Sequence, residues 1–180
     1  MHILMCNDDG ILADGLRHLA SYLSQYYRIT VVAPANEQSA KSHALTTEVP
    51  LKLDACNGED ENPRLYALTG TPSDCMKFGL SYLLTDDMPD LVISGINHGF
   101  NLGSDVLYSG TVSAAMESCF YGIPGLALSV ERYSPERGDE MHPFIHELIE
   151  KIYVKGNFDG LLNVNFPLRG VCDRAVSYTH

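Results

Sequence analysis

Hydrophobic residues along the chain fall into short apolar runs that alternate with stretches of helical periodicity. Residues 2–7 (HILMCN) form a run typical of a strand buried on both faces. Apolar residues from Leu12 to Leu23 recur at helical spacing and predict a helix over residues 14–26. The β-branched run 28–34 (RITVVAP) predicts a second strand that stops at its proline. A strand, a helix and a strand in this order predict a βαβ unit with parallel strands.

The same alternation continues along the chain. The polar stretch 36–47 has no periodicity, so we expect a loop over the carboxyl edge of the sheet. The apolar segments 49–55 and 64–70 flank a polar insert and predict a β-hairpin that projects from the main sheet. Further strands are expected over 90–97, 124–130 and 160–167, and further helices over 71–84, 112–121 and 136–154.

The start of one of these helices is marked by its capping residues. Thr71 is a suitable N-cap, Pro72 suits the first helical position, and Asp74 can return a hydrogen bond to the cap. The pattern as a whole predicts one doubly wound α/β domain.

Polar clusters follow three of the predicted strands. They are NDDG at residues 7–10, NEQSAKS at 36–42 and SGIN at 94–97. Because the carboxyl ends of parallel strands share one edge, where doubly wound sheets bind ligands, we expect the three clusters to converge.

Asp8 and Asp9 are adjacent carboxylates at the first of these strand ends. Two carboxylates about 4 Å apart repel each other by about 4 kcal/mol at an effective dielectric constant of 20. A divalent cation removes this repulsion, and oxygen donors suit Mg²⁺ or Mn²⁺. The alternative is a solvated turn or a helix cap. The other two polar strand ends favour the cation site.

A second candidate element is the segment YSGT. Ser109, Gly110 and Thr111 stand where a helix is expected to begin, and the free N–H groups there can bind an anion. Alone, the segment is typical of an ordinary helix cap. Beside a cation site it predicts a phosphate cradle, and the two together indicate metal-assisted phosphoryl chemistry.

Composition narrows the class of protein. The 180 residues suffice for one domain, and 12 basic against 23 acidic residues give a net charge of −11. This charge disfavours nucleic-acid polymers, while a bound cation would still admit a small anionic substrate. Five cysteines without a C-x-x-C pair indicate reduced thiols and no zinc site. With no signal-like or membrane-spanning apolar segment, we expect a cytoplasmic protein without a membrane partner.

Five longer segments stand in order along the chain: NDDGILADGL, VVAPANEQSAKSHALTT, GTPSDCMKFGL, SGINHGFNLGSDVLYSGTVSAAMES and LNVNFP. Together they resemble the SurE (survival protein E) family of metal-dependent nucleotidases, from Met1 to about Pro167. The resemblance implies a Rossmann-like, mostly parallel sheet with a projecting β-hairpin, in a single domain over residues 1–180.

The resemblance also implies a site and an activity. Asp8 and Asp9 would be catalytic and would bind one divalent ion, Mg²⁺ or Mn²⁺, together with Ser39 and Asn97. The implied reaction is release of phosphate from nucleoside 5′- and 3′-monophosphates, and from short polyphosphate ends, by a homodimeric or homotetrameric enzyme. The residues assigned to substrate phosphate are Asn36, Asn101, Ser109, Gly110 and Thr111.

Two departures from the family pattern stand out. Ala40 follows Ser39 where the family usually has glycine, and a methyl group there would affect the placement of the serine hydroxyl. The sequence ends at His180, whereas relatives generally continue with further strands and a helix. We therefore expect a domain without the usual C-terminal extension, and a truncated, a naturally compact and an inactive form remain open.

Other readings of the same residues remain. Attack by a water molecule, with Asp8 as proton acceptor, is favoured over a covalent aspartyl-phosphate because a carboxylate shared with a metal is less free to attack. The main functional alternative is a non-catalytic nucleotide-binding module. A haloacid-dehalogenase-type enzyme would have D-x-D after the first strand, and a dehydrogenase would have G-x-G-x-x-G there. Neither motif follows the first predicted strand, so both classes are disfavoured.

The histidines add no second site. His142 and His146 are four residues apart on a predicted helix, but no third zinc ligand accompanies them, so a surface or partly buried pair is expected. His43 and His98 lie beside the predicted site, and the sequence leaves their roles open.

Overall fold

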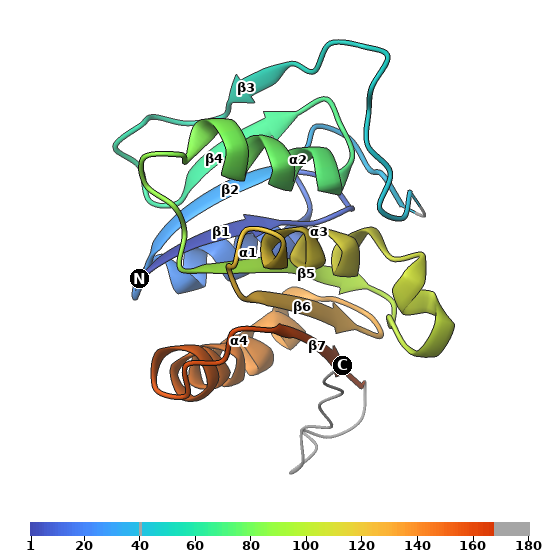
Figure 1. Cartoon of the computed structure of the whole chain (residues 1–180). Coiled ribbons are helices and arrows are strands. Elements are labelled where there is room, and N and C mark those ends of the chain that lie inside the picture. The colour runs from blue at the N-terminus through green and yellow to red at the C-terminus, as the bar shows by residue number, and fades with distance from the viewer. Residues whose placement is uncertain (40, 168–180) are drawn as a thin grey trace.

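The computed structural model describes residues 1–39 and 41–167 and contains one seven-stranded sheet. The strand order is β3-β4-β2-β1-β5-β6-β7 (Figure 1). All neighbouring strands are parallel except β3 and β4, which are antiparallel. The strands are β1 (His2–Cys6), β2 (Arg28–Pro34), β3 (Leu53–Ala55), β4 (Arg64–Leu68), β5 (Leu91–His98), β6 (Gly125–Val130) and β7 (Leu161–Phe166).

Helices cover both faces of this sheet, which confirms the predicted α/β class. α1 and α4 pack together on one face, and α2 and α3 pack together on the other (Figure 1). The helices are α1 (Asp14–Leu23), α2 (Pro72–Phe78), α3 (Gly110–Cys119) and α4 (Pro135–Ile149), with single-turn segments η1 (Gly79–Leu83), η2 (Gly103–Leu107) and η3 (Glu150–Val154).

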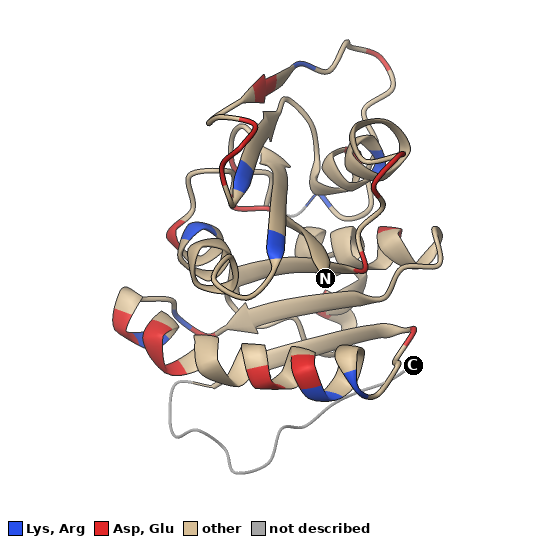
Figure 2. Cartoon of the chain, turned by 90° about the vertical axis from the view of Figure 1, so that its left-hand side faces the viewer, with Lys and Arg blue, Asp and Glu red and all other residues tan. Residues whose placement is uncertain are grey.

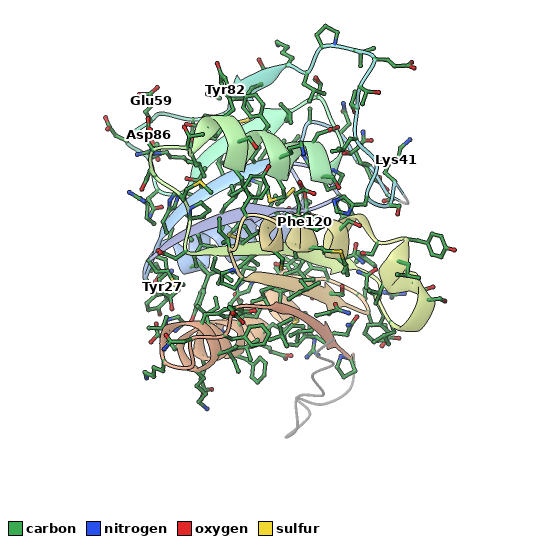
Figure 3. The ribbon with its side chains drawn as sticks, viewed as in Figure 1. Tyr27, Lys41, Glu59, Tyr82, Asp86 and Phe120 are labelled. Carbon is green, nitrogen blue, oxygen red and sulfur yellow. The ribbon has the colours of Figure 1, made fainter. Side chains whose placement is uncertain are left out.

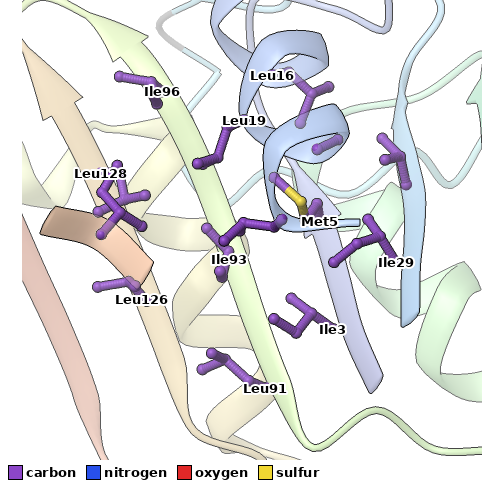
Figure 4. Close-up of a cluster of buried hydrophobic side chains, with 14 of the residues drawn as sticks. Ile3, Met5, Leu16, Leu19, Ile29, Leu91, Ile93, Ile96, Leu126 and Leu128 are labelled. Carbon is purple, nitrogen blue, oxygen red and sulfur yellow. The ribbon is translucent and has the colours of Figure 1, made fainter. Parts of the chain in front are cut away.

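Apolar clusters on both faces of the sheet hold these layers together, and a small third one joins Val112 and Ala115 of α3 to Ala127 of β6. On the α1/α4 side, Ile3 and Met5 of β1 and Ile93 of β5 pack against Leu16 and Leu19 of α1 (Figure 4). On the α2/α3 side, the alternate residues of the strands meet the other pair of helices. Because successive side chains of a strand point to opposite faces, a strand buried on both sides is mostly apolar. All five residues of β1 are buried: four are apolar, and His2 shares a hydrogen bond with the Thr30 hydroxyl at 2.9 Å.

Sequence signals account for several element boundaries. Thr71 and Asp74 form the predicted capping box at the start of α2, with Pro72 at the first helical position. α1 ends at Leu23, earlier than residue 26, because the Tyr26 N–H bonds to the Leu23 carbonyl in a tighter turn.

The predicted hairpin is present at one edge of the sheet. β3 and β4 form it, and β4 also pairs in parallel with β2, so the hairpin is continuous with the main sheet. Acidic positions outnumber basic ones along α4 and η3 (Figure 2), where Arg137 pairs with Glu140 and Lys151 with Glu147.

The remaining expectations concern cysteines and membranes. Cys6, Cys56, Cys75 and Cys119 are free thiols. Cys172 and Ala40 lie outside the described residues. No helix in the described part of the chain has both the length and the apolar character needed to span a bilayer.

Candidate functional site

Three strand ends meet at one edge of the sheet. β1 lies between β2 and β5 and is parallel to both, so the carboxyl ends of all three point to the same edge. The direction of winding reverses between β1 and β5, and such switch points are where doubly wound sheets bind ligands. The segments NDDG, NEQS and SGIN therefore converge as the sequence predicts.

The NDDG segment is a closed turn that presents its two carboxylates. The Asn7 side chain donates to the Gly10 carbonyl at 3.0 Å and accepts from the Gly10 N–H at 3.1 Å. Gly10 has a φ of +99°, which few other residues adopt. The Gln38 N–H donates to the Asp8 carbonyl at 2.7 Å and thereby joins this turn to the loop after β2.

Asp8 is buried against the N-terminus of α3. Its Oδ1 accepts a hydrogen bond from the Thr111 hydroxyl at 2.7 Å. Gly110 allows this approach, since a Cβ there would lie 3.0 Å from Oδ2 of Asp8. Burial raises the pKa of Asp8, and the nearby Glu37 adds to the rise, although the bonds from Thr111 partly offset it. The positive end of the helix dipole also favours a carboxylate in this place.

Asp9 and Glu37 extend the negative charge. Burial, then repulsion by Asp8 and Glu37, raises the pKa of Asp9 to about 6, against a smaller opposing effect of His98. Glu37 was not predicted from the sequence, because a glutamate in a polar loop resembles any solvated charge. Its charge raises the pKa of both aspartates, so three carboxylates gather at this turn.

Ser39 follows β2, and Asn97 lies near the end of β5, the two strands that flank β1. Ser39 is exposed, and its hydroxyl donates to Glu37 Oε1 at 2.8 Å. Asn97 follows an irregularity in β5, where three steps from Ser94 match two steps on β6. Such a bulge redirects the next side chain. The Asn97 amide nitrogen donates to the Gly99 carbonyl at 2.8 Å, which leaves the side-chain oxygen as the atom that could coordinate a cation.

The residues assigned to substrate phosphate differ from one another in burial and in hydrogen bonding. Ser109 caps α3, since its hydroxyl accepts from the Val112 N–H at 3.1 Å. Asn36 is exposed after β2. Asn101 is buried, and its amide donates to the Ser129 hydroxyl at 2.8 Å. Asn101 thus belongs to the β6–β7 side of the edge, and its neighbours Asn163 and Asn165 are contacts that the sequence did not predict.

Comparison with known proteins agrees with this architecture. A family model described as Survival protein SurE matches residues 3–180. The chain belongs to the SurE family.

Individual relatives support the assignment to SurE. The 5′-nucleotidase SurE of Thermoanaerobacter sp. (strain X514) is 49% identical over 168 residues, covering 93% of this chain and 66% of the relative. The protein of the same name from Synechococcus sp. (strain JA-3-3Ab) is 48% identical over 177 residues, covering 96% and 68%. The crystal structure of the SurE protein from Aquifex aeolicus superposes with a TM-score of 0.81 at 38% identity, covering 93% and 66%. The chain thus spans about two thirds of the length of these relatives.

The donor set in this SurE-family chain can be tested against a divalent cation. No group of three or more His, Cys, Asp or Glu side chains suited to a metal occurs in the described residues, so an ion at the two aspartates would need neutral oxygen donors as well, for which the sequence predicts Ser39 and Asn97. Two neighbouring carboxylates with raised pKa values lack sufficient positive charge around them. Hard oxygen donors of this kind fit Mg²⁺ or Mn²⁺.

The four histidines singled out in the sequence of this SurE-family chain form two pairs with different surroundings. His43 Nε2 lies 2.6 Å from Glu117 Oε2, and His98 lies beside Asp9. His142 is buried beside Tyr22 of α1, and the half-buried His146 stacks on Tyr26 with ring centroids 4.0 Å apart. The expected surface or partly buried pair is thus confirmed for His146, whereas His142 is buried more deeply than predicted.

Proposed function

We propose that the chain is a metal-dependent phosphohydrolase that releases phosphate from nucleoside 5′-monophosphates. The observation that carries the proposal is the acidic turn at Asp8 and Asp9, undercompensated in charge and held at the N-terminus of α3. The names of the SurE relatives support the substrate class. We extend the proposal to 3′-monophosphates and to the ends of short polyphosphates.

The residues that would hold the ion are Asp8, Asp9, Ser39 and Asn97. A bound divalent ion supplies Lewis-acid activation of water and of the phosphoryl group. The Thr111 hydroxyl orients the Asp8 carboxylate by a bond to Oδ1, so that side chain is held in one position before substrate arrives. We assign to Asp8 the further role of accepting the proton of the attacking water.

The substrate phosphate would lie at the start of α3. Backbone N–H groups and the helix dipole there favour an anion. Ser109 fixes the first turn through its cap, and Gly110 keeps the approach open. Asn36 is free at the surface to reach a phosphate oxygen. The Asn101 amide nitrogen donates one N–H to the Ser129 hydroxyl, and its second N–H would be the group that donates to a phosphate oxygen.

Assembly and location complete the proposal. We infer a cytoplasmic homodimer or homotetramer, on the basis of the family resemblance. Large apolar side chains on the surface, among them Leu107, Tyr108 and Phe120, are 68–72% exposed and would suit burial between copies of the chain. Light scattering on the purified protein would measure the assembly directly.

A phosphate-release screen tests the proposed activity. The chain would be incubated with each nucleoside 5′- and 3′-monophosphate and with short polyphosphates, in the presence of Mg²⁺, Mn²⁺ or a chelator. We expect release from 5′-monophosphates that depends on the metal and stops with the chelator. Nucleotide binding without release under every condition would instead indicate a non-catalytic module.

A further inference from the structure

Glu117 is a buried carboxylate that the proposed chemistry does not use. It lies on α3 and is only 5% exposed, so its charge needs a close partner. His43 Nε2 provides one at 2.6 Å from Oε2. Lys77 Nζ lies farther away, at 3.9 Å from Oε1, and its side chain is 53% exposed. His43 is therefore the principal partner of this carboxylate.

His43 belongs to the loop that carries Ser39, four residues earlier. The His43 ring is directed toward α3, where it also stacks on Phe120, which follows the helix, with ring centroids 6.1 Å apart. Lys41, by contrast, points outward from the loop (Figure 3). Since the loop has no helix or strand of its own, its position depends on such contacts.

Hydrogen bonds on both sides of Ser39 attach its loop to the rest of the chain. On one side, the Gln38 N–H is bound to the Asp8 carbonyl at 2.7 Å. On the other side, the Ser42 hydroxyl donates to the Leu107 carbonyl at 3.0 Å, and His43 adds the bond to Glu117. A serine between fixed points explores fewer positions than one in a free loop, so its hydroxyl is kept near the acidic turn.

One helix, α3, binds both Asp8 and His43. Thr111, in the first turn of α3, donates to the Asp8 carboxylate at 2.7 Å. Glu117, six residues later and about 9 Å farther along the helix axis, holds His43. Because an α-helix is rigid over this length, α3 fixes the separation between Asp8 and the loop.

We propose that Glu117 and His43 are positioning residues that hold the Ser39 loop in place for cation binding. The proposal rests on the proposed function only through the role of Ser39, since the attachment of the loop can be measured on the protein without metal or substrate. Neither residue touches the reacting atoms in this account.

The test compares His43→Ala with His43→Gln in the whole chain. The first readout is amide hydrogen exchange of residues 41–47 without metal, and the second is the Kd for Mn²⁺ alone. We expect His43→Ala to speed exchange in this segment and to raise the Kd by about 10-fold, the size found when a residue supporting a metal ligand is lost. His43→Gln should restore most of both values, because its amide can also donate to Glu117. At saturating Mn²⁺, kcat should change little.

Tyr153→Phe is the matched control. It removes a buried hydrogen bond, from the Tyr153 hydroxyl to the Gly125 carbonyl at 3.0 Å, at the opposite edge of the sheet. Exchange in 41–47 and the Kd should stay as in the unmodified chain.

The outcomes separate this proposal from the proposed function. Unchanged exchange in 41–47 for His43→Ala overturns it, as does faster exchange spread evenly over the whole chain. An unmodified chain that neither binds Mn²⁺ nor releases phosphate would overturn the proposed function, and exchange would then decide the positioning role by itself.

Discussion

Asp8 and Asp74 are both buried aspartates at the N-terminus of a helix on the same face of the sheet, yet their surroundings differ. Asp74 accepts from the Thr46 hydroxyl at 2.6 Å, the Thr46 N–H at 3.0 Å and the Thr71 N–H at 2.9 Å. Burial alone would raise the pKa of Asp74, but these bonds outweigh it, and the pKa is lowered. Its negative charge is fully stabilised by the protein.

Asp8 lacks this compensation. Thr111 is its side-chain partner, and Asp9 and Glu37 add negative charge instead of donors. Burial therefore prevails, and the pKa of Asp8 is raised. The contrast teaches that burial or a helix terminus does not by itself mark a functional carboxylate. A functional carboxylate is marked instead by negative charge that the surrounding protein leaves uncompensated, and a bound cation would compensate it.

Asp8→Asn should produce the largest effect on activity. Loss of a carboxylate that holds both ion and water should lower phosphate release by at least about 10³-fold. The thermal midpoint should stay the same or rise, because the change also removes repulsion with Asp9. Release from 5′-AMP and thermal unfolding would be measured together, with the exposed Asp86→Asn as the control. An active Asp8→Asn enzyme would contradict the functional role assigned to Asp8.

Asp74→Ala, unlike Asp8→Asn, should mainly lower the stability of the fold. It removes three hydrogen bonds to a buried charge and the capping box of α2, so we expect the free energy of unfolding to fall by about 3 kcal/mol. Urea unfolding would measure it. Asp54→Ala, which removes only the exposed pair with Lys52, should change stability by less than about 0.5 kcal/mol. A stable Asp74→Ala variant would contradict the structural role of this carboxylate.

His142 sharpens the comparison as a buried group without a proposed function. Burial lowers its pKa from 6.5 to about 4, with Asp139 opposing and His18 adding to the shift. Its Nε2 has no hydrogen-bond partner among the described residues. Because the unfolded chain binds this proton more readily, stability should decrease as the pH falls from 6.5 toward 4. Between pH 7 and pH 5 the loss should be about 2 kcal/mol.

Urea unfolding at the two pH values would test the His142 prediction. In His142→Leu this part of the pH dependence should vanish, whereas phosphate release at pH 7 should persist. An identical pH dependence in both proteins would show that His142 does not titrate as described.

Thr111→Val should give the smallest effect. The substitution keeps the size of the buried side chain but removes the bond to Asp8, at a cost of about 1 kcal/mol in stability. Release of the Asp8 carboxylate from its fixed position should also weaken Mn²⁺ binding by about 10-fold. Val112→Ala would serve as a control for packing at the start of α3. Unchanged Mn²⁺ affinity in Thr111→Val would show that the bond from Thr111 to Asp8 does not contribute to cation binding.

Most of the fold could be predicted from the sequence, because its strands are either apolar throughout or end in strong turn residues. β1 and β2 have nearly the predicted bounds, and the capping box at Thr71 and Asp74 is confirmed. The end of α1 was less predictable, since the choice between an α-helical and a tighter last turn depends on small differences in hydrogen bonding.

The site was only partly predictable. The convergence of three strand ends followed from the parallel sheet alone. Contacts across large sequence separations, such as Thr111 with Asp8 and Glu117 with His43, could not be predicted, because neither partner carries a local signal. The same holds for Glu37, whose importance depends on what surrounds it in space.

The central claim is that the acidic turn binds a divalent cation, whereas Asp74 does not depend on one. Titration of the metal-free chain with Mn²⁺, monitored by electron paramagnetic resonance, tests it most directly. We predict one ion bound per chain, lost in Asp8→Asn and retained in Asp74→Asn. Equal binding by the unmodified chain and Asp8→Asn, or no binding by either, would contradict the account.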